Sequence, residues 1–229
     1  MSRARGAGAS QGRRAPARWG RLAAVLALAF APLVQGATFN QVFREGVDYV
    51  DIYPPAPTST KKGVEVVEVF WYGCDTCYLI QPYMRNWIKT QPRSVHYRRM
   101  PGLINAKMDL DARAFYAAKA LGVVSRIHQP LFKAIHEDHR ELDTKGALAE
   151  FFDEQGIGKQ KFLKAFNSPA VASQMFRARN LTARYGIKGV PSIIVNGRYY
   201  TDPTRVKSPD ELVMVVNFLV KQEMQRLNH

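Results

Sequence analysis

The feature that most constrains this 229-residue chain is its only pair of cysteines, Cys74 and Cys77. They follow residues 64–72, which are almost continuously apolar, β-branched or aromatic. Such a run predicts a strand that is buried on both faces of a sheet. Over residues 78–90 the apolar side chains instead recur every three or four positions, as in an amphipathic helix. The sequence therefore places Cys74 at a strand-to-helix junction and Cys77 about one helical turn later.

This location predicts a reactive thiol at Cys74. Unpaired backbone N–H groups and the positive end of the helix dipole favour the thiolate, which is the nucleophilic form of cysteine. At such positions a cysteine pKa falls from about 8.5 to between about 3.5 and 7.5. Cys77 lies one turn into the helix, where it is covered and suited to resolve a mixed disulfide formed at Cys74.

A Cys-x-x-Cys pair can also belong to a zinc site or form a structural disulfide. Zinc needs about four ligands, and the chain has no further cysteine. Only His136 and His139 have a paired spacing among the histidines, and they lie in a charged segment that predicts an exposed helix end. Redox chemistry therefore explains the pair better than metal binding, and we expect no metal and no organic cofactor.

The first 36 residues are typical of an export signal. They contain six arginines and no acidic residue, and the apolar run at residues 22–34 is too short to span a bilayer comfortably. We predict cleavage after Gly36 and a periplasmic mature chain that begins near Ala37. An uncleaved membrane anchor is the alternative.

The charge of the chain does not indicate a nucleic-acid partner. Lys and Arg number 33 against 19 Asp and Glu, a formal charge of +14 that falls to +8 without the six arginines of the leader. The remaining basic residues could favour acidic partners or an anionic surface, but they are spread along the sequence without an RNA or DNA motif. Two cysteines at one motif in an exported chain indicate a working redox pair.

An acidic residue, Glu68, interrupts the apolar strand six residues before Cys74. A carboxylate beneath a sheet is costly unless it is paired or protonated. It is either exposed on an edge strand or buried below the cysteines, where it would tune the thiol pKa and relay protons. The apolar residues on both alternations favour the buried position. The next predicted strand offers three basic residues that could neutralise it, and the sequence does not distinguish among them: His96, Arg98 and Arg99.

The rest of the chain predicts a long helical tract, a β-hairpin around Asn196-Gly197 and a closing helix near residues 208–227. This order of elements resembles the thioredoxin fold with an inserted all-helical domain, an α/β fold. We therefore predict a signal peptide at 1–36, a first thioredoxin-like part at 37–102, a helical insertion at 103–185 and a second thioredoxin-like part at 186–229.

Three stretches make the resemblance more specific. Residues 68–77, Gly189-Val190-Pro191 and the hairpin at 195–199 are similar to the bacterial periplasmic thiol:disulfide oxidoreductases of the DsbA family, and the likeness covers almost the whole mature chain. The resemblance implies that Cys74 is the exposed nucleophile, Cys77 the buried resolving cysteine and Glu68 the buried acid. It also implies a cis Val190–Pro191 bond and a Val190 backbone that holds substrate polypeptide beside Cys74.

The chain departs from the family between the cysteines. Strongly oxidising members commonly carry proline and histidine there, whereas this chain has Asp75 and Thr76. The Asp75 carboxylate repels a Cys74 thiolate, although it also favours the helix N-terminus. We therefore predict a higher Cys74 pKa and a weaker oxidant than the relatives with proline and histidine.

The reaction that we predict is disulfide donation to reduced exported polypeptides by exchange at Cys74 and Cys77. The family implies reoxidation by a quinone-linked inner-membrane partner of the DsbB type. We expect a monomer. Four apolar groups could offer a surface to unfolded chains, with ordinary core as the alternative: Phe70, Trp71, Tyr72 and the Val190 loop.

Two alternative functions stay open. The less oxidising dipeptide suits a periplasmic disulfide isomerase or reductase, although the sequence shows no added dimerisation region. The protein could instead be chiefly a polypeptide-binding chaperone, or a dedicated partner of one exported enzyme, with secondary redox activity.

Overall fold

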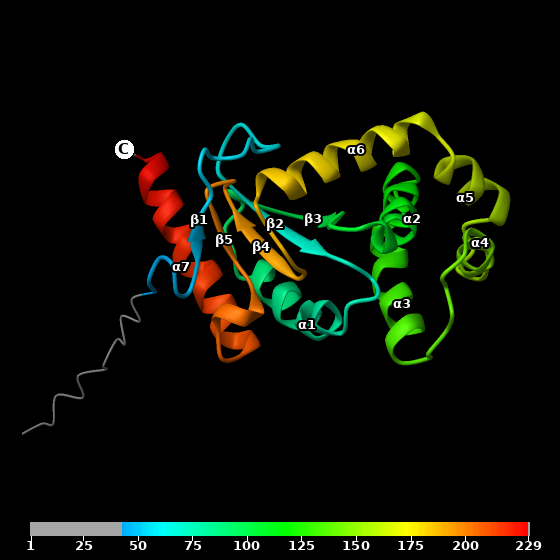
Figure 1. Ribbon diagram of the computed structural model, residues 1–229, viewed down its shortest axis with the longest axis horizontal. Helices are drawn as coiled ribbons and strands as arrows, with labels where there is room; N and C mark the ends of the chain where they lie inside the picture. The colour runs from blue at the N-terminus through cyan, green and yellow to red at the C-terminus, as the bar shows by residue number, and fades with distance from the viewer. Residues whose placement is uncertain (1–42, 229) are drawn as a thin grey trace, which may run out of the picture. The chain divides into compact units, whose positions relative to one another are not determined.

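The computed structural model describes residues 43–228, so the predicted export signal and the first residues of the mature chain lie outside the described part. One mixed sheet has the strand order β1-β5-β4-β2-β3. Its strands are β1 (Val50–Asp51), β2 (Val64–Phe70), β3 (Val95–Pro101), β4 (Ser192–Val195) and β5 (Tyr199–Thr201). Strand β2 lies between β3 and β4 and runs parallel to β3 and antiparallel to β4 (Figure 1).

Helices flank the sheet and fill the long interval between β3 and β4. Within residues 43–228 the α-helices are α1 (Asp75–Lys89), α2 (Asp109–Ala120), α3 (Val124–His136), α4 (Lys145–Glu154), α5 (Lys159–Phe166), α6 (Pro169–Arg184) and α7 (Pro209–Leu227). Two short 3₁₀ turns, η1 (Ala106–Met108) and η2 (Pro203–Arg205), precede α2 and α7. Helices α2 to α5 gather at one side of the sheet, away from α7 (Figure 1). The predicted thioredoxin-like fold with a helical insertion is confirmed.

Strand β2 is buried along its whole length because both of its faces are covered. On one face Val64 and Val66 pack in a cluster with apolar residues of α1 and α7. On the other face Val67 and Val69 pack in a cluster with the helical insertion, including Phe115. The continuous apolar run in the sequence follows from this two-sided burial, as predicted.

The hairpin and the junction after β2 also follow from local sequence. Asn196 and Gly197 have φ values of 50° and 63°, the left-handed conformations that a two-residue Asn-Gly turn requires. A side chain at Gly197 would clash, because an added Cβ would lie 2.1 Å from the backbone oxygen of Ala56. Helix α1 begins at Asp75, earlier than its apolar periodicity, because Cys74 serves as its N-cap.

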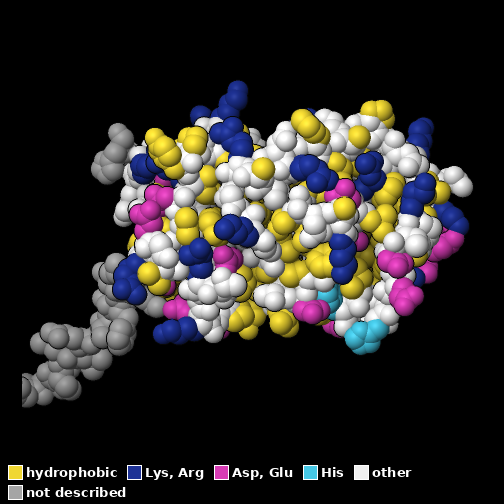
Figure 2. All heavy atoms as spheres, in the orientation of Figure 1, with side chains coloured by type: hydrophobic (Ala, Val, Ile, Leu, Met, Phe, Trp, Pro, Cys, Tyr) yellow, Lys and Arg dark blue, Asp and Glu magenta, His cyan; other side chains and the backbone are white. Residues whose placement is uncertain are grey.

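Charged groups are dispersed on the face of the molecule shown in Figure 2. On the face shown in Figure 2, Lys and Arg side chains lie among acidic, polar and apolar ones instead of forming one basic patch. Among residues 43–228, no helix combines the length and the apolar character needed to cross a bilayer.

Candidate active site

The two cysteines lie where β2 gives way to α1. Cys74 has extended backbone angles, and its sulfur accepts a hydrogen bond from the Cys77 backbone N–H at 3.1 Å. Both residues are free thiols; Cys74 is partly exposed, whereas Cys77 is fully buried. The predicted placement of an accessible thiol and a covered thiol one helical turn apart is confirmed.

This arrangement separates the acidities of the two thiols. The pKa of Cys74 lies below its ordinary value, chiefly because the Cys77 thiol hydrogen-bonds to the Cys74 sulfur. The backbone N–H groups of Cys77 and Thr76 lower it further, whereas partial burial and the Asp75 charge raise it. Burial and the neighbouring Cys74 raise the pKa of Cys77 far above its ordinary value. At neutral pH, Cys74 is therefore the thiol with nucleophilic character, and Cys77 keeps its proton.

A second chain segment faces Cys74 across the site. The Val190–Pro191 peptide bond is cis, as the family resemblance implied. The Val190 backbone oxygen lies 3.4 Å from the Cys74 sulfur and accepts its S–H hydrogen bond. The fold thus brings together the two cysteines and the loop before β4, which follows the helical insertion in sequence.

The buried acid lies on the α1 side of the sheet. Glu68 has no exposed surface and accepts hydrogen bonds from the Gln81 amide of α1 and the Tyr97 hydroxyl of β3. Arg99 lies beside it, with Nε 3.3 Å from a carboxylate oxygen, whereas Arg98 pairs with Glu65 at 3.0 Å. The sequence prediction of a buried Glu68 is confirmed, and Arg99 is the basic residue that pairs with it.

Gln81 joins Glu68 to a hydrogen-bond chain that the sequence did not reveal. Its amide nitrogen also donates to the Cys77 carbonyl at 3.3 Å, and its oxygen lies 3.0 Å from Nε2 of the buried His128. Burial lowers the pKa of His128 to about 2, so the ring is neutral, donates to Gln81 and accepts from the Tyr72 hydroxyl at 3.0 Å. The Glu68 carboxylate, the Gln81 amide and the His128 ring are therefore all hydrogen-bonded below Cys77.

The sequence of residues 65–213 matches the protein family described as "DSBA-like thioredoxin domain". The chain belongs to the DsbA family. It is 35% identical over 196 residues to the thiol:disulfide interchange protein DsbA of Pseudomonas aeruginosa, covering 86% of this chain and 93% of that protein. DsbA of Azotobacter vinelandii is 38% identical over 178 residues, covering 78% and 83%. The crystal structure of Pseudomonas aeruginosa DsbA superposes with a TM-score of 0.78 at 34% identity, covering 82% of this chain and 97% of that chain.

The two residues between the cysteines of this DsbA-family chain face solvent. Thr76 is exposed, and the Asp75 side chain is 92% exposed. The Asp75 charge does act against the Cys74 thiolate, as predicted. The hydrogen bonds from the Cys77 thiol and from the N–H groups at the helix N-terminus outweigh it, so the pKa of Cys74 is lowered. Whether this chain is a weaker oxidant than relatives with proline and histidine stays a prediction.

A histidine of the helical insertion reaches the same helix N-terminus. His136, the last residue of α3, has Nδ1 2.9 Å from an Asp75 oxygen and Nε2 2.6 Å from the Tyr72 backbone oxygen. Its side chain is only 9% exposed, so the prediction of an exposed His136 was wrong, whereas His139 is exposed. The available signal was its spacing, because His128, Phe132 and His136 recur every four residues on one face of α3.

A buried acid near the motif was also not predicted from the sequence. Asp111 of α2 lies against Trp71 and Gly73, just before Cys74, and burial raises its pKa to about 6.

Among the described residues, no group of three or more His, Cys, Asp or Glu side chains is arranged to hold a metal ion.

The aromatic residues before the motif do not form the predicted apolar surface together. Phe70 and Tyr72 are buried in contact with each other, their ring centroids 5.0 Å apart, so ordinary core is their role. Trp71 is half-buried and folds over Gly73, with the Lys107 ammonium 5.2 Å from its ring. Of the four predicted groups, Trp71 and the Val190 loop can therefore contribute to an accessible surface.

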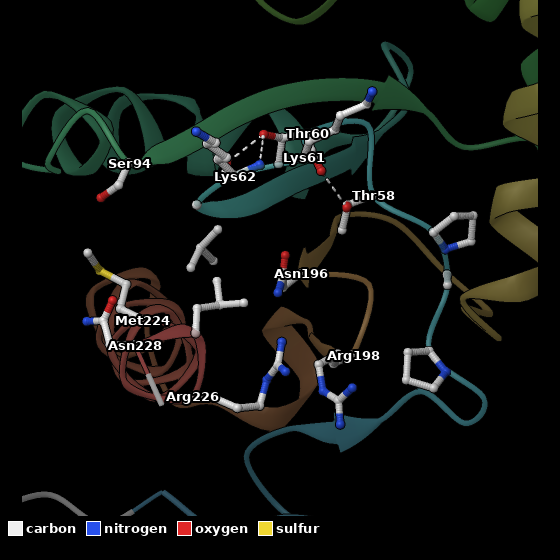
Figure 3. Close-up of a pocket in the computed structure, with 16 residues that line it drawn as sticks. Thr58, Thr60, Lys61, Lys62, Ser94, Asn196, Arg198, Met224, Arg226 and Asn228 are labelled. Carbon is white, nitrogen blue, oxygen red and sulfur yellow. Dashed lines mark hydrogen bonds between the residues drawn. The ribbon is translucent and has the colours of Figure 1, made fainter.

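Two hollows differ in their relation to the cysteines. One of about 430 Å³ adjoins the motif and is lined by Thr76, Val190, Pro191 and residues of the β5–η2 segment. Another of about 710 Å³ lies at the start of β2, between the 55–63 connector, the Asn196–Arg198 turn and the end of α7 (Figure 3). About 20 Å of strand β2 separates this larger hollow from Cys74, so the larger hollow is not part of the candidate active site.

Proposed function

We propose that this protein is a thiol:disulfide oxidoreductase that donates a disulfide to exported, folding proteins. The observation that carries the proposal is the position of Cys74. Its sulfur accepts a helix N-terminal N–H at 3.1 Å and lies 3.4 Å from the Val190 carbonyl, while Cys77 is buried behind it. An activated, accessible thiol, a covered partner and an adjacent main-chain segment are the parts that disulfide exchange on a polypeptide requires.

The proposed reaction begins with the Cys74–Cys77 disulfide. A substrate thiolate attacks the Cys74 sulfur, the disulfide bond breaks and Cys77 leaves; the high pKa of Cys77 then draws a proton to it. A second substrate thiolate attacks the substrate sulfur of the mixed disulfide, and Cys74 leaves as a thiolate. The substrate gains a disulfide, and two electrons remain on the reduced pair. The lowered pKa of Cys74 makes it a good leaving group and favours donation over the alternative isomerase or reductase function.

The proposed role of Glu68 is electrostatic and acts on Cys77. Its charge adds to burial in raising the pKa of Cys77, which favours the protonated resolving thiol. Its pairing with Arg99, Gln81 and Tyr97 holds that charge in place below the site. We also propose that Glu68 relays protons below the cysteines.

Val190 and Pro191 are the proposed substrate-binding residues. They line the 430 Å³ hollow, which also contains Thr76, Tyr200, Pro203 and Arg205. A polypeptide lying in this hollow would bring its cysteine beside Cys74 and pair its backbone with the Val190 peptide group. Asp75 and Thr76 are proposed to tune the thiol from the solvent side.

The proposed setting is the periplasm, with the export signal at 1–36 and the domain limits predicted from the sequence. Reduced exported polypeptides would be the substrates, and a quinone-linked membrane oxidase of the DsbB type would reoxidise the pair. We propose a monomer.

The test is oxidation of a reduced two-cysteine peptide by the purified, oxidised mature protein, with the reduction potential measured against glutathione. A potential near about −120 to −200 mV and loss of activity in Cys74→Ser support disulfide donation. A potential near about −270 mV would instead indicate a reductase or isomerase. Polypeptide binding and folding assistance that survive in a Cys74→Ser/Cys77→Ser variant would indicate a chaperone.

A further inference from the structure

His136 contacts the chain on both sides of the nucleophilic cysteine. Nε2 lies 2.6 Å from the backbone oxygen of Tyr72, two residues before Cys74, and Nδ1 lies 2.9 Å from the carboxylate of Asp75, the residue after it. One imidazole from the helical insertion thus spans the turn that carries Cys74. The ring is held in place by its surroundings, since its side chain is only 9% exposed, while its Asp75 partner faces solvent.

Both partners of the ring are hydrogen-bond acceptors. A backbone carbonyl only accepts, and an ionised carboxylate only accepts. The Asp75 side chain is 92% exposed, and its negative charge acts on Cys74. A neutral imidazole carries one N–H and can satisfy one of the two oxygens, whereas an imidazolium donates to both.

The other groups around the ring are compatible with a positive charge. Tyr78 stacks on His136 with ring centroids 5.1 Å apart and an interplanar angle of 6°, and Phe132 lies at 5.8 Å. Aromatic faces attract cations. The Tyr78 hydroxyl donates to Glu137, and Glu137 is paired with Lys133 at 3.6 Å, while Lys133 also contacts Asp138. The charges beyond Tyr78 are therefore paired with one another, and Asp75 is the ionic partner of His136.

We propose that His136 is a positioning residue that donates through both ring nitrogens, to the Tyr72 carbonyl and the Asp75 carboxylate, offsets the Asp75 charge and so supports the Cys74 thiolate. This inference rests on the proposed function, because it concerns the tuning of the same cysteine. The relatives with histidine in the motif supply such a group from within it. Here the helical insertion supplies it from α3, 61 residues away from Asp75.

The consequence is a coupling between proton binding at His136 and the redox equilibrium. A cation near Cys74 stabilises the thiolate and hence the reduced pair, which makes the disulfide a stronger oxidant. When His136 loses its proton, one of its two hydrogen bonds is lost and the Asp75 charge acts on Cys74 without an offset. The stabilisation of the thiolate is therefore present only while both ring nitrogens of His136 carry protons.

The direct test is the protonation state of the ring, followed by nitrogen NMR on the reduced mature protein at pH 7. We expect both ring nitrogens of His136 to carry protons. In Asp75→Asn we expect only one, since an amide can donate to Nδ1 and a neutral ring is then satisfied. A wild-type ring with a single protonated nitrogen at pH 7 would overturn the inference.

The functional readouts are the ultraviolet titration of the Cys74 thiolate and the equilibrium with glutathione. His136→Gln should raise the Cys74 pKa and shift the equilibrium toward the disulfide by about two- to fivefold, the range expected for one exposed ion pair. The same substitution in an Asp75→Asn background should have little effect, because the charge that it offsets is already gone. Equal effects in the two backgrounds would contradict the proposed coupling.

His139→Gln is the matched control, because His139 is exposed three residues further on. It should leave both readouts unchanged, and a shift as large as that of His136→Gln would count against the proposal. Failure of the proposed function is recognised separately. If the His136 ring is doubly protonated and His136→Gln alters the thiol titration, but the protein oxidises no peptide, this inference is supported and disulfide donation is contradicted.

Discussion

The sulfur of Cys74 accepts a hydrogen bond from the backbone N–H of Cys77 at 3.1 Å, so the nucleophile caps the helix that carries its own resolving partner. Because of this cap, the acidity of the Cys74 thiol depends on the position of helix α1. Helix α1 satisfies one of its free N–H groups through the sulfur, and the sulfur gains the positive end of the helix dipole.

Removal of the Cys77 thiol should make Cys74 less acidic. The side-chain hydrogen bond from Cys77 is the largest cause of the lowered Cys74 pKa. A hydrogen bond to a charged group contributes about 1.5–3 kcal/mol, so Cys77→Ala should raise the Cys74 pKa by about 1–2. The rate of Cys74 alkylation as a function of pH measures this. Cys77→Ser, which keeps a hydroxyl donor, should restore part of the shift; an unchanged Cys74 pKa in Cys77→Ala would contradict it.

Gly102 should control the position of Val190. A side chain at Gly102 would place its Cβ 2.8 Å from Cγ1 of Val190 and 3.3 Å from Cγ1 of Val69. Gly102→Ala should therefore displace the Val190 side chain and slow exchange with a peptide about tenfold, while exchange with free glutathione changes less. Stopped-flow measurements with the two thiols test this difference. Val190→Ala removes the clashing methyl group, so the double variant should recover peptide exchange; no recovery would place the effect of Gly102→Ala elsewhere.

Asp111 should make stability depend on pH. Burial raises its pKa to about 6 from an ordinary value of 3.8, so the folded state binds its proton more tightly than the unfolded state. This contribution to the free energy of unfolding is present below about pH 4 and lost as the pH rises through about 6, a change of about 3 kcal/mol. Asp111→Asn should remove it and leave the protein more stable than wild type at pH 7.5. Urea unfolding at pH 4 and pH 7.5 measures both effects.

The control for that experiment is Asp109→Asn. Asp109 is partly exposed and pairs with Arg179 at 2.8 Å, so its loss should change stability by less than about 1 kcal/mol. If Asp111→Asn and wild type lose stability equally between pH 4 and pH 7.5, Asp111 is not the group responsible.

Glu68 and Arg99 should be coupled in stability. Glu68→Gln leaves the partly buried Arg99 guanidinium without its carboxylate and should lower the free energy of unfolding by about 3 kcal/mol. Arg99→Gln should cost a similar amount, because it leaves the buried Glu68 charge unpaired. Denaturant unfolding of the double variant should show a loss smaller than the sum, and strict additivity would contradict the pairing. Arg98→Gln, which affects Glu65 instead, should be additive with Glu68→Gln.

The local sequence was sufficient to predict the elements that carry the cysteines. The two-sided apolar run predicted β2, the change to helical periodicity predicted α1, and Asn196-Gly197 predicted the β4–β5 turn. These predictions succeeded because each depends on side-chain spacing or backbone preference within a few residues. Burial of Glu68 was also predictable, since its neighbours are apolar on both sides of the strand.

Contacts between distant segments were not predictable in the same way. Arg98 and Arg99 have the same charge, and only the pleat of β3, which turns them to opposite faces, assigns Arg99 to Glu68 and Arg98 to Glu65. His136 lies at a helix end with charged neighbours, and its contact with Asp75 depends on how α3 packs beside α1. Tyr72 follows a strand and precedes a motif, a position equally compatible with core or surface.

The insertion of five helices between β3 and β4 also affects biogenesis, because ribosomes make the chain from its N-terminus. Cys74 and Cys77 are synthesised long before Val190, which lies 116 residues after Cys74. Until then the nascent chain has its thiols but lacks the segment that faces them, and the edge of β2 that later receives β4 has no partner. A nascent chain at that stage is therefore a reduced polypeptide with an open strand edge, the kind of edge on which other chains can pair.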